Sequence, residues 1–369
     1  MSLTSETSTD LLDDVFRLLL DAGASDLHWS DGGSLHLRVN GFLELAEVPE
    51  SVSRISFDEL TTHLIGRDNF ATFVERREYD GARTVLGGSR VRINVFFKRG
   101  RIAWAVRLLP SEFFPMESLG LDLDICARIC ELKQGLVLVT GATGSGKTTT
   151  LASLLHHINR HRREHIFTIE DPIEYVHESR ECMVSQREVG VDTASFHEAL
   201  RSVLREDPDI VLLGEMRDRI SMDAALTLSE TGHLTFATLH TSGAVDTISR
   251  IISAFDSMEQ GQIRERLATN LKVVITQQLV PWTNREGRSL CAEIMVSTKA
   301  IRAMIRDGKE RQMLSAIETS SDEGMTTMNK SLADLVKRRL ITQKEAGLYS
   351  PDRDSLKRHF EVPQLMRSV

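Results

Sequence analysis

Eight consecutive residues, Gly141-Ala142-Thr143-Gly144-Ser145-Gly146-Lys147-Thr148, fit the phosphate-binding pattern G-x-x-x-x-G-K-[ST]. Its glycines allow the backbone to turn sharply and to approach a phosphate without an intervening Cβ. Successive backbone N–H groups and the amino end of the next helix then attract the anion. The pattern predicts that Lys147 reaches the β- and γ-phosphates and that the Thr148 hydroxyl binds Mg²⁺. We assign these eight residues and Thr149 to ATP binding.

Acidic side chains follow two further apolar segments. Glu170 and Glu174 lie at and just beyond the end of segment 165–169, and Glu215 comes after Gly214 at the end of another. Carboxylates in such positions can align an attacking water or hold Mg²⁺. We expect Glu174 to be the general base, with Glu170 as the competing candidate, and Glu215 to act on Mg²⁺ or its water. Helix-capping acids and a solvated strand-end glutamate are the structural interpretations of the same residues.

Histidines and arginines complete the candidate set. His240 lies at the carboxyl end of segment 233–239, where it can sense a γ-phosphate, although a single histidine is more often structural. His233, at the other end, is expected to orient neighbouring backbone. Arg92 and Arg107 lie in alternating, strand-like segments near the N-terminus. They either solubilise a sheet face or reach a triphosphate across a subunit boundary, as arginine fingers do.

The elements that must position these residues change character along the chain. Beyond residue 118, short apolar segments alternate with helical patterns, which predicts a mostly parallel sheet with helices on its faces. From about residue 243 onward the pattern is mainly helical. Residues 1–110 are strand-rich, with helices expected over 10–22 and 57–75. The apolar strands expected beyond residue 118 cover 135–140, 165–169, 209–214 and 233–239.

Composition excludes several classes of protein. The 369-residue chain has a net charge of −8, so no global basic field draws it to nucleic acid. No apolar run approaches the ~18 residues of a membrane span, and residues 1–10 do not resemble a signal peptide. We therefore expect a cytoplasmic protein without direct membrane insertion. The four cysteines form no C-x-x-C pair, which favours reduced structural thiols.

Together these motifs resemble the type II/IV secretion ATPases, and among them the type IV pilus retraction ATPases of the PilT type. The resemblance covers nearly the whole chain. Its Walker A motif is 141–148, and its Asp box is within 168–175. An atypical Walker B motif spans 205–218, with Gly214 in the place of the usual aspartate, and a His box spans 231–240.

The resemblance implies an α/β chain with a PAS-like α+β N-terminal domain over 1–110 and a linker over 111–117. A RecA-like ATPase domain with a helical C-terminal part would cover 118–369. It implies a ring homohexamer that uses ATP and Mg²⁺, with Arg92 and Arg107 as sensor arginines. The ring would work at the inner face of the bacterial inner membrane with a pilus platform protein. A paralogous retraction or assembly ATPase is a further candidate partner.

Two features favour retraction over pilus assembly. We find neither the extra N-terminal domain nor the tetracysteine zinc module that assembly ATPases usually carry, and residues 300–307, A-I-R-A-M-I-R-D, resemble the retraction motif A-I-R-N-L-I-R-E. Ala303, Met304 and Asp307 depart from that motif, which keeps an accessory PilU-like ATPase as a second candidate. An assembly or secretion ATPase, a nucleotide-gated ring with little turnover and a nucleic-acid motor are also compatible with a phosphate-binding loop.

The motif segment also has a helical pattern over 299–311. Its spacing puts Ile301, Met304 and Ile305 on one face and a basic stripe on another. We expect the apolar face to pack on the ATPase domain and the stripe to stay exposed. The stripe consists of Arg302, Arg306 and Lys309.

Overall fold

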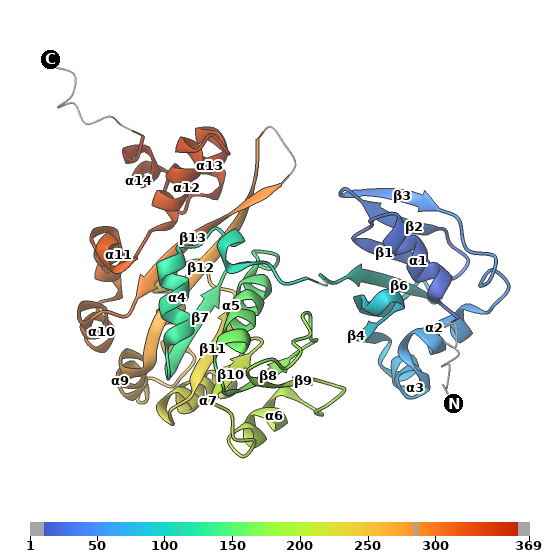
Figure 1. The fold of residues 1–369 in the computed structure, drawn as a ribbon, viewed down its shortest axis with the longest axis horizontal. Helices are drawn as coiled ribbons and strands as arrows, with labels where there is room; N and C mark the ends of the chain where they lie inside the picture. Colours follow the sequence, from blue (N-terminus) through green and yellow to red (C-terminus); the bar gives the residue numbers. More distant parts are fainter. Residues whose placement is uncertain (1–10, 111, 284–286, 361–369) are drawn as a thin grey trace. The chain divides into compact units, whose positions relative to one another are not determined.

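The computed structural model describes residues 11–110, 112–283 and 287–360 (Figure 1). The chain forms two compact units. The first consists of Met1–Glu112 together with Asp171–Val176, and the second of Phe113–Glu170 together with His177–Val369. The predicted boundaries of the domains and linker, at 110 and 118, stay a prediction.

The first unit is built on a six-stranded antiparallel sheet in the order β3-β2-β1-β6-β5-β4. Its core contains an aromatic cluster in which Trp29 contacts Phe57 and Trp104 edge-on. The elements are α1 (Asp13–Asp21), β1 (Asp26–Ser30), β2 (Leu35–Val39), β3 (Phe42–Ala46), α2 (Phe57–Ile65), α3 (Arg67–Arg76), β4 (Glu78–Thr84), a 3-10 turn (Leu86–Gly88), β5 (Arg90–Lys98) and β6 (Arg101–Leu108).

Two expectations for this unit need correction. The helix predicted over 57–75 is two helices, because Gly66 between them has φ of 85°, which a continuous helix does not allow. Strand β4 was not predicted. Its sequence carries polar side chains on both faces, and it becomes a strand by pairing with β5 from Thr84↔Arg90 to Glu78↔Phe96.

The second unit contains a seven-stranded sheet in the order β13-β12-β7-β11-β10-β8-β9, parallel except for β13. Alternate residues of β7 supply the cores on the two faces: Leu136 and Leu138 on one, Val137 and Val139 on the other. The strands are β7 (Gly135–Thr140), β8 (His165–Glu170), β9 (Met183–Glu188), β10 (Ile210–Leu213), β11 (Leu234–Leu239), β12 (Leu271–Pro281) and β13 (Arg288–Val296).

Helices cover both faces of this sheet and form the C-terminal part (Figure 1). They are α4 (Leu123–Glu131), α5 (Lys147–His161), α6 (Phe196–Val203), α7 (Arg219–Glu230), α8 (Ala244–Ser253), α9 (Gln260–Asn270), α10 (Lys299–Arg306), α11 (Glu310–Thr319), α12 (Met328–Lys337), α13 (Gln343–Tyr349) and α14 (Arg353–Arg358), with 3-10 turns at Met116–Ser118 and Ser321–Glu323. The mixed α/β fold with a parallel-rich sheet is thereby confirmed.

The mainly helical expectation beyond residue 243 is wrong for one hairpin. Strands β12 and β13 pair with each other, and β12 pairs in parallel with β7. The run Val273-Val274-Ile275 is β-branched and buried or nearly so, which suits a strand inside a sheet. Among the described residues, no helix is both long and apolar enough to cross a bilayer. All four cysteines are buried and free.

The motif helix is shorter than predicted. Helix α10 ends at Arg306, because Gly308 adopts φ of 70° and Lys309 already precedes α11. Ile301 and Ile305 are buried, as expected. The basic stripe is not continuous. The half-buried Arg302 donates from Nε to the carbonyl of Ser297 at 3.0 Å, whereas Arg306 pairs with a glutamate of α9 and Lys309 pairs with Asp307.

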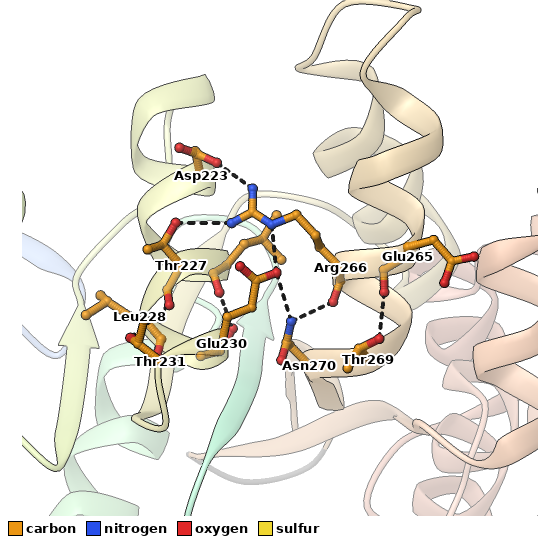
Figure 2. A network of polar contacts seen from close by, with 11 residues as sticks. Asp223, Thr227, Leu228, Glu230, Thr231, Glu265, Arg266, Thr269 and Asn270 are labelled. Carbon is orange, nitrogen blue, oxygen red and sulfur yellow. Dashed lines mark hydrogen bonds and ion pairs between the residues drawn. The ribbon is translucent and has the colours of Figure 1, made fainter.

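A polar network joins α7 to α9 (Figure 2). Arg266 of α9 donates from Nε to Glu230 and from Nη1 to Asp223, both at 2.7 Å, and from Nη2 to Thr227 at 3.1 Å. Asn270 adds a hydrogen bond to the same glutamate at 3.2 Å. These hydrogen bonds raise the pKa of Arg266, with that from Glu230 the largest cause, against the opposing effect of burial. The network fixes α9 against the helix that follows β10.

Replacing Arg266 with Ala should lower the free energy of unfolding by about 1–3 kcal/mol, because Glu230 and Asp223 each lose a hydrogen bond from the guanidinium. The matched control is Arg306→Ala, which removes an arginine from an exposed pair with Glu265 and should cost less than about 1 kcal/mol. Urea unfolding followed by circular dichroism measures both. Equal losses would show that the network stabilises no more than a surface pair does.

Candidate active site

The glycine loop connects β7 to α5, which begins at Lys147. Gly146 precedes the helix in a left-handed conformation with φ of 91°. Gly141 has φ of 137°, and a Cβ placed on it would lie 2.3 Å from the carbonyl oxygen of Gln277 on β12. Both positions therefore require glycine. The first is the turn into the helix and the second is a close approach of two backbones.

Polar groups inside this loop fit a phosphate ligand. Ser145 is only 5% exposed, and among the described residues its Oγ has no hydrogen-bond partner. Lys147 donates from Nζ to the carbonyls of Gly141 at 2.7 Å and Ala142 at 3.1 Å. A phosphate would offer the ammonium a charged acceptor in place of these neutral ones. The remaining loop residues, Thr143 and Gly144, are exposed, and Thr148 and Thr149 lie half-buried in the first turn of α5.

Three of the predicted site residues meet at the carboxyl edge of the sheet. Nδ1 of His240 lies 3.5 Å from Nζ of Lys147, and its Nε2 lies 3.1 Å from Oε1 of Glu215. A neutral imidazole protonated on Nε2 satisfies both contacts, accepting from the lysine and donating to the glutamate. Nε of Arg217 donates to the other oxygen of Glu215 at 2.9 Å. The glycine loop, the His box and the Walker B segment are thus connected through side chains.

Gly214 explains why the carboxylate follows one position later than in the usual Walker B motif. Its N–H donates to the carbonyl of Ile169 at 2.9 Å, and its carbonyl accepts from the Thr238 hydroxyl at 2.5 Å. A Cβ here would lie 3.0 Å from the Ile169 oxygen and 3.4 Å from Cα of Glu170. Any larger side chain would crowd the end of β8, so Glu215 is the first acid that β10 can present.

The two candidate bases lie in different surroundings. Glu170 ends β8 and is 8% exposed; its Oε1 accepts from Thr168 Oγ1 at 2.7 Å and from Gln186 Nε2 at 3.0 Å. Glu174 is half-buried and belongs to Asp171–Val176, which is part of the first unit. The choice between them as the base stays a prediction.

The two predicted sensor arginines pair with aspartates of the first unit. Arg92 makes a bidentate contact with Asp80, at 3.1 and 2.6 Å, and Arg107 donates from Nε to Asp26 at 2.8 Å. Burial by itself raises the pKa of Asp26, but hydrogen bonds from Arg107 and Ser25 outweigh it and lower that pKa. Both guanidinium groups are held in place by carboxylates of their own sheet.

A neighbouring arginine of β5, two residues before Arg92, was not among the predicted site residues. Arg90 donates from Nε to the carbonyl of Ile173 at 2.7 Å, which ties β5 to the Asp-box segment. The pKa of Arg92 is raised, first by its hydrogen bond to Asp80 and further by the charges of Glu174 and Asp171. The Asp box and the arginine strand are therefore electrostatically coupled within the first unit.

Strand β12 supplies residues that sequence reasoning missed. Gln277 donates from Nε2 to the buried hydroxyl of Thr150 in α5 at 2.7 Å. The hydroxyl of Thr276 lies 2.9 Å from that of Thr140, the last residue of β7. These contacts brace both ends of the glycine loop. The β-branched run that ends in Thr-Gln could have indicated this strand in the sequence. It was missed because the region was expected to be mainly helical.

The donor atoms fit Mg²⁺, which prefers oxygen ligands and usually keeps several waters. The Thr148 hydroxyl and the Glu215 carboxylate follow strands whose carboxyl ends lie at one edge of the sheet. Within the described part of the chain, no group of three or more His, Cys, Asp or Glu side chains is placed to hold an ion.

His233 has the structural role expected of it. Its Nδ1 lies 3.0 Å from the Leu228 carbonyl and from the Thr231 hydroxyl, and its own carbonyl accepts from the Gly135 N–H. It therefore fixes the turn between α7 and β11 at the amino edge of the sheet, away from the glycine loop.

Known proteins are similar to this chain over most of its length. The family model for type II/IV secretion system proteins matches residues 4–347. The chain is 44% identical to the type IV pilus retraction ATPase PilT of Pseudomonas aeruginosa over 328 residues, which is 88% of this chain and 93% of that protein. It is 34% identical to the type IV pilus ATPase PilU of the same organism over 344 residues, or 93% and 89%.

A solved structure agrees with these sequences. The crystal structure of the pilus retraction motor PilT with bound ADP has a TM-score of 0.84 and 39% identity, and the match covers 94% of this chain and 98% of that one. Family model, relatives and fold therefore point the same way, and this chain belongs to the type II/IV secretion system protein family, in which it is similar to the PilT-type retraction ATPases.

Proposed function

We propose that this chain is an ATP-hydrolysing motor that powers type IV pilus retraction. The observation that carries the chemistry is the contact chain from Lys147 through His240 to Glu215 at the carboxyl edge of the sheet. Similarity to PilT, and to a PilT structure that holds ADP, supports the nucleotide and the pilus. The higher identity to PilT than to PilU favours a primary retraction motor over an accessory one.

Each residue of the site has a role in this proposal. The glycine loop surrounds the triphosphate, and Lys147 exchanges its two backbone carbonyl acceptors for the β- and γ-phosphates. Glu174 or Glu170 takes the proton of the attacking water, and His240 transmits the state of the γ-phosphate to Glu215. Mg²⁺, when held by Thr148 and Glu215, neutralises charge on the phosphate oxygens.

The assembly is a further part of the proposal. We infer a homohexameric ring in which Arg92 and Arg107 complete a nucleotide site across a subunit boundary. The ring would act at the inner face of the bacterial inner membrane on a pilus platform protein, alone or with a paralogous ATPase. No partner nucleic acid is expected, since the chain carries a net charge of −8.

Glu215→Gln should keep ATP binding and lower turnover by about 100-fold or more, because the amide cannot carry the charge that orients water or Mg²⁺. The matched control is Glu178→Gln, at a side chain that is 77% exposed and pairs only with Arg180 among described residues. Phosphate release and binding of a fluorescent ATP analogue measure the two properties. Near-normal turnover in Glu215→Gln would contradict the assignment.

Arg92→Lys and Arg107→Lys should each slow hydrolysis at least about tenfold, because an ammonium cannot reproduce a bidentate contact with phosphate oxygens. Lysine keeps a positive charge beside Asp80 and Asp26, so the first unit should stay folded. Arg17→Lys, at an exposed arginine of α1 paired with Asp14, is the control. A fully active fragment starting near residue 118 would show that neither arginine contributes.

Deleting the gene should abolish pilus retraction, and the wild-type gene should restore it. A gene carrying both Arg302→Ala and Arg306→Ala should not restore retraction. The double variant should keep part of its ATPase activity, because alanine preserves helix α10. Twitching and pilus-dependent phage infection measure retraction in cells. Phosphate release by the purified variant measures ATP hydrolysis. If the double variant retracts pili normally, this helix does not couple hydrolysis to force.

A further inference from the structure

A cavity of about 170 Å³ lies at the amino edge of the seven-stranded sheet. Helix α4, the first residues of β12, the last of β13 and helix α10 supply its lining. Lys272 of β12 lies over the start of β7, since a Cβ on Gly135 would be 2.3 Å from its Cε. Parallel strands β7 and β12 have their other ends at the glycine loop, so this cavity is separate from the proposed ATP site.

Three cationic side chains line this cavity: Arg128, Lys272 and Arg302. Arg128 donates from Nη1 to the carbonyl of Glu323, and Arg302 donates from Nε to the carbonyl of Ser297, both at 3.0 Å. No carboxylate in the described part of the chain forms an ion pair with any of the three. Three like charges around one small space repel one another unless an anion offsets them.

The pKa of Lys272 lies below its ordinary value. Burial lowers it, and the neighbouring charge of Arg302 lowers it further. No acidic group acts in the opposite direction on this lysine among the described residues. An anion in the cavity would reverse the shift, because an opposite charge favours the ammonium form.

A buried hydroxyl provides a second, independent observation. Ser297 lines the cavity and is 4% exposed, and its Oγ has no hydrogen-bond partner among the described residues. Its backbone N–H donates to the carbonyl of Lys272 at 2.8 Å, which fixes the serine beside the lysine. Buried hydroxyls are nearly always hydrogen-bonded, so an unsatisfied one beside three cations indicates a missing acceptor.

We propose that this cavity is a binding site for a small phosphate-bearing anion. Arg128, Lys272 and Arg302 would neutralise the phosphate, and the Ser297 hydroxyl would donate to one of its oxygens. The volume is below the ~300 Å³ of typical small-molecule pockets, which excludes a whole nucleotide and suits a phosphate or a short phosphomonoester. Ile125, Ile129 and Val273 add an apolar wall for a short carbon chain.

The test uses the full chain saturated with a non-hydrolysable ATP analogue and Mg²⁺, so that the β- and γ-phosphate positions at the glycine loop are filled before phosphate is added. Isothermal titration with inorganic phosphate, at an ionic strength held constant with chloride, should give saturable binding at one site per chain. Arg302→Gln should raise the dissociation constant at least tenfold. Arg306→Gln is the matched control on the same helix, since its guanidinium pairs with Glu265 and does not line the cavity.

Ser297→Ala provides a milder variant that keeps the fold and should weaken phosphate binding several-fold. A parallel titration with glycerol phosphate distinguishes an organic phosphomonoester from inorganic phosphate as the ligand. Tighter binding of glycerol phosphate than of phosphate indicates the phosphomonoester, and weaker binding indicates inorganic phosphate. The proposal is overturned if neither anion binds saturably to the chain loaded with the ATP analogue. Equal effects of Arg302→Gln and Arg306→Gln would overturn it as well.

Discussion

The parallel register of the central strands is the constraint on which the site depends. Leu239 pairs with Thr140, and Leu213 pairs with both Ala237 and Ile169. The segments that follow β7, β11, β10 and β8 therefore leave the sheet at one edge. A slip of one residue would turn each strand's side chains to the opposite face and separate the glycine loop from the His box and the Walker B segment.

Close packing at this edge leaves little choice of side chain. Gly141 touches the backbone of β12 and Gly214 touches the end of β8, so neither position admits a Cβ without movement. What remains is a row of polar contacts, from Lys147 through His240 to Glu215 and Arg217. In the proposed mechanism, a phosphate that draws the lysine away would change the surroundings of the histidine and then of the glutamate, and the nucleotide state would reach α7 by this route.

The two edges of the same sheet have different electrostatics. Strands β7 and β12 run from the cationic cavity beside Lys272 to the glycine loop, where Gln277 and Thr276 brace α5 and β7. Helix α10 lies at the cavity end, with Arg302 turned to the cavity lining and Arg306 paired outward. An anion in that cavity would therefore contact the helix proposed to transmit force while lying on strands that also carry the ATP site.

Much of the fold and of the nucleotide loop was predictable from the sequence, because both depend on local patterns. The spacing of the glycines before Lys147 indicates the loop, and four apolar runs indicate the strands β7, β8, β10 and β11. Both patterns depend only on residues that are close together in the sequence. Tertiary structure alone decided what depends on distant partners: the place of β12 beside β7, the enclosure of Glu170 by Gln186, and the different surroundings of Arg302 and Arg306. A helical pattern predicts which face a side chain lies on, but the contacts of that face come from segments far away in the chain.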